Sequence, residues 1–142
     1  MADSNGRFVR WQATQVTQLG FILNLVLGFA VAALGLWASL LRDTGFHPDC
    51  WAKCFFDLSA ISLVIAITTG LLCSLNRLWD FRITAGIARG NWNGDELKDK
   101  RRESDLLGKL TWRLLYLEIS MFSLGIFLLM ATLALVYRFK LF

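Results

Sequence analysis

Three long stretches of this 142-residue sequence carry no charged side chain, and they constrain the fold more than any other feature. Residues 11–41, 58–76 and 119–137 contain no Asp, Glu, Lys or Arg. About 20 apolar residues let an α-helix cross the ~30 Å hydrocarbon core of a bilayer. The sequence therefore predicts an all-α integral membrane protein with three transmembrane helices. The predicted spans cover about residues 17–41, 55–76 and 114–137.

The composition points the same way. Hydrophobic residues make up 56% of the chain, against roughly 45–50% in ordinary soluble domains. One proline and three cysteines exclude a proline-rich linker and a disulfide-stapled scaffold. We expect a single membrane domain over residues 1–142.

The basic residues predict the orientation of this domain. Nine of the 15 Lys and Arg residues lie in residues 77–113 and two lie before residue 11, whereas only four lie in the 42–54 loop and after residue 137. Short loops rich in Lys and Arg stay on the cytoplasmic side. We therefore expect a multi-pass protein of the cell membrane, the inner membrane in a two-membrane cell, with a cytoplasmic N-terminus and an external C-terminus.

Residues 77–113 predict an amphipathic and charged helical hairpin in the cytoplasm. Apolar residues continue at helical spacing past the second span, as far as Ile87. The run Gly90-Asn91-Trp92-Asn93-Gly94 breaks this helix, and Asn93 is the expected N-cap of the next one. No proline separates the second helix of the hairpin from the third span, so the two are expected to be continuous.

Small residues recur every fourth position in the first two spans. These positions predict close helix packing, because small side chains let helix backbones approach each other in lipid. Packing within the chain and packing between subunits are both compatible with the pattern. The two predicted packing faces comprise Gly20, Asn24, Gly28 and Ala32 in the first span, and Ser62, Ala66, Gly70 and Ser74 in the second.

Glu118 is the main candidate for a functional side chain, because an ionisable group inside a span is a functional candidate by default. Asn24 and Asn76 are its expected amide neighbours. Either Glu118 pairs with Arg77 or Arg113 and fixes the helix register, or copies of the chain place it in an acidic ring around a cation-selective pore.

Two further groups carry weaker predictions. Asp57 is expected in the first turn of the second helix, where the helix dipole favours an acid, with a second acidic ring as the alternative. His47, Cys50 and Cys54 lie in the external loop and are weak candidates for a metal site or, for the two cysteines, a disulfide. Structural zinc sites usually have four ligands, so we expect neither a bound metal nor a cofactor.

Basic residues near the membrane favour anionic lipid head groups as partners. The charge-balanced stretch from Asp95 to Asp105 is typical of a solvated helix face, so no nucleic acid partner is expected. The sequence contains none of the common phosphate-binding or hydrolase motifs, so we do not expect an enzyme. The predicted lipid-facing residues are Arg77, Arg82, Arg89, Lys109 and Arg113.

Three functions follow from these features. The first is a small homo-oligomeric membrane protein that forms a pore or ion-permeation path, gated or organised by its cytoplasmic hairpin. The second is a non-catalytic accessory or scaffold subunit of a larger membrane complex. The third is a membrane redox or metal-handling protein that uses His47, Cys50 and Cys54.

Overall fold

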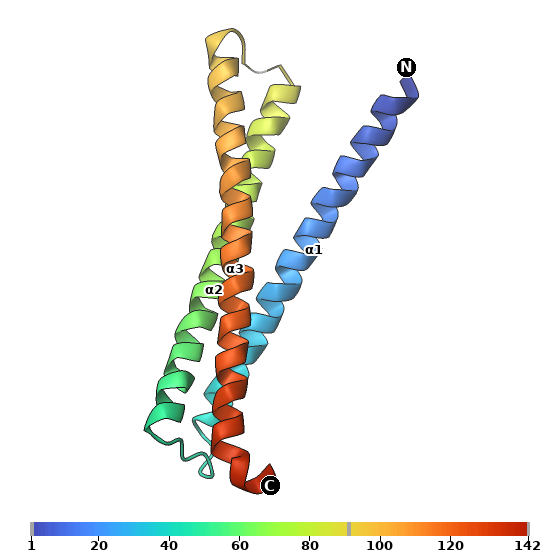
Figure 1. The fold of residues 1–142 in the computed structure, drawn as a ribbon. Coiled ribbons are helices and arrows are strands. Elements are labelled where there is room, and N and C mark those ends of the chain that lie inside the picture. Colours follow the sequence, from blue (N-terminus) through green and yellow to red (C-terminus); the bar gives the residue numbers. More distant parts are fainter. Residues whose placement is uncertain (1, 91, 142) are drawn as a thin grey trace.

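The computed structural model of the chain consists of long α-helices joined by short loops (Figure 1). It describes the backbone of residues 2–90 and 92–141 and the side chains of residues 17–90 and 92–137. In this described part, each of the three helices is long and apolar enough to cross a membrane. The all-helical prediction is confirmed. The helices are α1 (Ala2–Leu40), α2 (Cys50–Ala88) and α3 (Asp95–Leu141).

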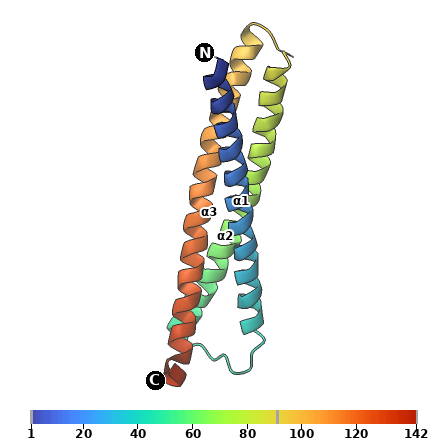
Figure 2. The ribbon, with the colours of Figure 1, turned by 90° about the vertical axis from the view of Figure 1, so that its right-hand side faces the viewer.

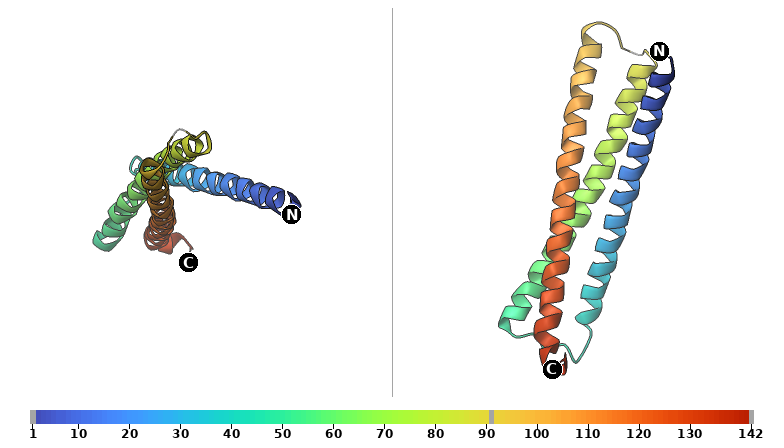
Figure 3. Two further views of the ribbon diagram at one scale, coloured as in Figure 1. Left: turned by 90° about the horizontal axis from the view of Figure 1, so that it is seen from above. Right: turned by 45° about the vertical axis from the view of Figure 1, so that its right-hand side comes forward.

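α2 and α3 form a long antiparallel hairpin, and α1 lies against it at an angle. α1 contacts the hairpin toward its C-terminal end and diverges from it toward its N-terminal end (Figures 1 and 3). The N-terminal end of α1 and the turn between α2 and α3 lie at one end of the molecule. The loop after α1 and the C-terminal end of α3 lie at the other (Figure 2).

The cytoplasmic hairpin predicted over residues 77–113 is formed by the C-terminal part of α2 and the N-terminal part of α3. α2 continues without interruption to Ala88, and α3 runs unbroken from Asp95 through its apolar segment. Gly90 and Gly94 have φ of +69° and +61°, a left-handed conformation that glycine adopts without steric cost. The predicted break is confirmed. Because α3 begins at Asp95, its N-cap position belongs to Gly94 rather than Asn93.

α2 begins five residues before the predicted boundary at 55 and shortly after Pro48. Proline disfavours helical backbone at the residue before it, and the helix begins at Cys50, immediately after an extended Asp49. The Lys53 amide donates to the Asp49 carbonyl at 2.8 Å and closes the first turn. Asp57 therefore lies about two turns into α2, and the first turn contains no acid. Its predicted first-turn position is wrong.

α1 is attached to the hairpin by two apolar clusters. Toward the loop after α1, Trp37 stacks on Phe56 with ring centroids 4.8 Å apart, and its Nε1 donates to the Phe56 carbonyl at 2.9 Å. Toward the other end, Leu23 packs with Cys73 and Leu115. Both clusters lie in the C-terminal half of α1, and the helix diverges from the hairpin toward its N-terminal end (Figure 1).

Candidate functional site

A buried carboxyl lies where the three helices meet. Glu118 of α3 is only 1% exposed and packs on the backbone of Gly70 in α2. A Cβ atom at residue 70 would lie 2.5 Å from Glu118 Oε1 and 3.3 Å from Cδ1 of Leu27 in α1. Only a residue without a side chain leaves room for the carboxyl, so the predicted packing residue Gly70 forms one wall of this site.

Both oxygens of Glu118 are buried and have no hydrogen-bond partner among the described residues. The predicted neighbour Asn76 makes other bonds, since its Nδ2 donates to the Leu107 carbonyl and to Thr111 Oγ1, both at 2.8 Å. Asn24 is exposed. Among the described side chains, Glu118 therefore does not form the predicted pair with Arg77 or Arg113.

The carboxyl lies well inside the apolar part of the bundle. Along α2, Gly70 precedes Arg77 by seven residues, which corresponds to about 10 Å at ~1.5 Å per residue. The facing segment of α1, Thr17–Leu40, carries no charged residue. Burying a polar group without a hydrogen bond costs about 2–7 kcal/mol and burying a bare charge costs more. This cost makes Glu118 the strongest functional candidate in the described part of the chain.

The burial of Glu118 also bears on the predicted acidic ring. A ring shared by several copies requires its carboxyls at a surface that the copies enclose. In the single chain, Glu118 instead faces Gly70 of the same chain. Asp57, the other proposed ring residue, is exposed on α2.

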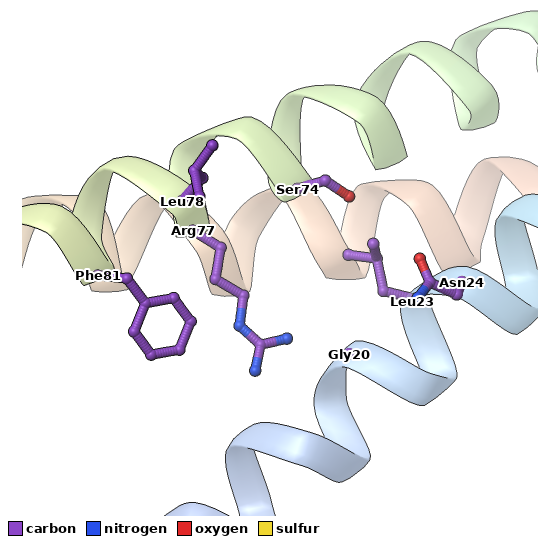
Figure 4. A pocket seen from close by; sticks show the side chains of 7 residues that line it. All are labelled: Gly20, Leu23, Asn24, Ser74, Arg77, Leu78 and Phe81. Atoms are coloured by element: carbon purple, nitrogen blue, oxygen red, sulfur yellow. The ribbon is translucent and has the colours of Figure 1, made fainter.

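A groove of about 240 Å³ between α1 and α2 lies next to this site (Figure 4). The Arg77 side chain extends from α2 toward α1, and a Cβ at Gly20 would lie 3.2 Å from its Nη1. Arg77 also lies 5.7 Å from the centroid of the Phe81 ring. At the end of the groove nearest Glu118, Asn24 and Ser74 provide an amide and a hydroxyl.

The groove ends one helical turn from the buried carboxyl. On α2, Ser74 Oγ donates to the carbonyl of Gly70 at 3.1 Å. On α1, Asn24 precedes Leu27 by three residues, which places the two on neighbouring turns of one face. One turn of α1 and one turn of α2 therefore separate the polar groove from Glu118.

The predicted small face of α1 divides between two environments. Gly20 faces Arg77, whereas Gly28 and Ala32 are exposed, with nothing within 4 Å of a Cβ at Gly28. Residues four apart on a helix are rotated by about 40° because one turn takes ~3.6 residues. Because α1 also lies at an angle to the hairpin (Figure 3), its row of such positions leaves the contact with α2. The exposed part continues as an outer small face of Gly28, Ala32, Gly35 and Ser39.

The small face of α2 lies inside the bundle. Ser62, Ala66 and Gly70 are buried, and Ser74 is half-buried. On α3, a Cβ at Gly125 would lie 2.8 Å from Leu63 Cγ. Close packing within the chain therefore occurs between α2 and α3 on this side.

Polar contacts also join the two helices of the hairpin, which the sequence did not indicate. Ser104 Oγ donates to Asp80 Oδ1 at 2.6 Å. The Trp92 ring covers Gly86, where any Cβ would overlap it, and Lys100 lies 5.9 Å from the ring centroid. The glycine at 86 in an otherwise regular helix is the only sequence signal for this contact.

The remaining predicted residues lie at the two ends of the molecule. His47, Cys50 and Cys54 are exposed, and the two cysteines are free thiols. Within the described residues, no three His, Cys, Asp or Glu side chains come together to hold a metal ion. Four of the predicted lipid-facing residues, Arg82, Arg89, Lys109 and Arg113, are exposed, and Arg77 is half-buried in the groove.

Comparison with known proteins adds no relative. No protein-family model, curated protein or solved structure matches the chain.

Proposed function

We propose that this chain is an integral membrane protein that assembles with copies of itself, and that the assembly provides a path for ions. The observation that carries this proposal is the outer small face of α1, whose four residues are exposed and at whose two glycines a Cβ would meet no other described residue within 4 Å. The cytoplasmic hairpin would organise or gate the assembly.

The arrangement of the helix ends supports the proposed topology. The N-terminal end of α1 and the turn after α2 lie at one end of the molecule (Figure 1), and 11 of the 15 basic residues belong to the segments at that end. An excess of Lys and Arg marks the cytoplasmic side. The N-terminus and hairpin are thus assigned to the cytoplasm, and the C-terminus to the outside.

Membrane insertion makes a second copy the natural partner for the outer small face. All copies cross the bilayer in the same direction, so Gly28 of one copy lies at the same membrane depth as Gly28 of the next. Lipid provides no hydrophobic drive between helices, and close approach of small residues supplies much of the association. Gly28 and Gly35, with nothing within 4 Å of a Cβ, allow such an approach.

An ion path would lie between copies, because three helices of one chain are too few to enclose one. The residues that could line such a path are the polar side chains exposed within the apolar segments. In the described part of the chain these include Asn24, Thr68, Ser120 and Ser123.

The test compares two substitutions to leucine at exposed positions, Gly28→Leu on α1 and Ala134→Leu on α3. We expect wild type and Ala134→Leu to form detergent particles at a multiple of the 16.1 kDa chain mass, and Gly28→Leu to fall to the monomer. Planar-bilayer conductance should follow the oligomer.

Other outcomes separate the alternatives. A monomeric wild type would contradict the assembly, and an oligomer without conductance would contradict the ion path. A stoichiometric second protein on the same face, lost in Gly28→Leu, would favour an accessory subunit instead.

A further inference from the structure

The outer face of α1 does not explain why the carboxyl of Glu118 is buried. Assembly through α1 needs no acid in the interior of the protomer. Yet Glu118 is 1% exposed, neither oxygen has a described hydrogen-bond partner, and Gly70 leaves the space that it occupies.

The groups around this carboxyl supply no compensating hydrogen bond. From α2, the titratable and charged side chains nearest to Gly70 are Cys73, which donates to the Thr111 carbonyl, and Arg77, whose guanidinium lies beside Gly20. α1 presents no titratable side chain between residues 17 and 40. On α3, Arg113 and Tyr116 are exposed.

Binding of a single proton lowers the energetic cost of burying this carboxyl. A bare carboxylate in an apolar interior is strongly unfavourable unless it is paired. Protonation removes the charge and leaves a neutral acid, whose burial without a hydrogen bond costs far less than the burial of a bare carboxylate. A metal ion would need several oxygen ligands, and no group of three or more His, Cys, Asp or Glu side chains that could hold one comes together among the described residues.

The groove between α1 and α2 is a polar opening beside this carboxyl. Asn24 and Ser74 lie at its inner end, one helical turn from Leu27 and Gly70. α1 is the helix that diverges from the hairpin (Figure 1), and Leu27 of α1 closes the last turn between the groove and the carboxyl. The groove lies toward the end assigned to the cytoplasm.

We propose that Glu118 is an intramembrane proton-binding site, occupied by a proton when α1 is packed on the α2–α3 hairpin and reached from the cytoplasmic end through the groove at Asn24 and Ser74. Proton release then requires α1 to move, so the occupancy of this site and the position of α1 are coupled. The site belongs to one protomer and does not depend on assembly.

Infrared spectroscopy of the full chain reconstituted in vesicles tests the proposal directly. We expect a carbonyl band of a protonated carboxylic acid at neutral pH in wild type, shifted but kept in Glu118→Asp, and lost in Glu118→Gln. A wild-type spectrum without this band, or one identical to that of Glu118→Gln, would overturn the proposal. So would a band that appears only when sodium is replaced by a bulky organic cation, because sodium would then be the ligand.

The access route has its own readout. Transfer to heavy water shifts the carbonyl band as the acid proton exchanges. Filling the groove with Ser74→Leu should slow this exchange roughly tenfold relative to the matched Ala134→Leu, the effect of about 1.4 kcal/mol on an opening barrier. Equal exchange rates in the two variants would refute the groove as the route. A monomeric protein that keeps the band would contradict self-assembly and leave the proton site intact.

Discussion

Gly70 is the residue on which the buried carboxyl depends. Its lack of a side chain lets Glu118 lie against the α2 backbone, with Leu27 closing the space from α1. The sequence indicated Gly70 as a packing residue and Glu118 as a functional candidate. It did not connect them, because their contact depends on the register between α2 and α3, which no local pattern specifies.

Gly70→Ala should lower the free energy of unfolding by about 1–3 kcal/mol, since overpacking costs this much in a filled interior. Gly108→Ala is the matched control, because no atom lies within 4 Å of a Cβ at residue 108. Replacing a helical glycine there should raise stability by roughly 0.5–1 kcal/mol. Reversible unfolding in mixed micelles measures both variants.

The contact with Glu118 is isolated by a double-mutant cycle. Gly70→Ala should be much less harmful when Glu118→Ala has removed the carboxyl, because the two changes then share one space. Additive effects of the two substitutions, or equal effects of Gly70→Ala and Gly108→Ala, would be inconsistent with the described site.

At the scale of elements, hydrogen bonds from Asn76 join α2 to α3 where the cytoplasmic hairpin of residues 77–113 meets the apolar segments. Its amide donates to Leu107 and Thr111. Asn76→Ala should therefore destabilise the protein by about 1–2 kcal/mol, given roughly 0.6–1.7 kcal/mol for a hydrogen bond between membrane helices. Thermal unfolding in detergent, compared with Asn24→Ala at an exposed position, measures this. Similar losses of stability in both variants would show that the hydrogen bonds between α2 and α3 do not stabilise the protein.

The sequence predicted the elements well and their ends less well. The absence of charge over residues 58–76 and 119–137 and the glycines at 90 and 94 are local signals, and the helices and the break follow them. The start of α2 was misplaced because the prediction followed the apolar stretch, whereas the helix follows Pro48. The division of the α1 face depends on its angle to the hairpin, which is a tertiary property.

At the scale of the whole molecule, the three apolar helices are arranged so that the basic segments share one end. Two of the three native cysteines, Cys50 and Cys54, are exposed at the opposite end, and Cys73 is buried in the bundle. The chain therefore carries its own probes of orientation.

Labelling these cysteines in intact cells with a membrane-impermeant maleimide, after mild reduction, tests the membrane topology most directly. Cys50 and Cys54 should react from outside, and Cys73 only after denaturation. In a Cys50→Ser, Cys54→Ser background, Arg101→Cys should react only after the cells are permeabilised. External labelling of Arg101→Cys, or native cysteines that react only after permeabilisation, would contradict the assigned topology and the cytoplasmic position of the hairpin.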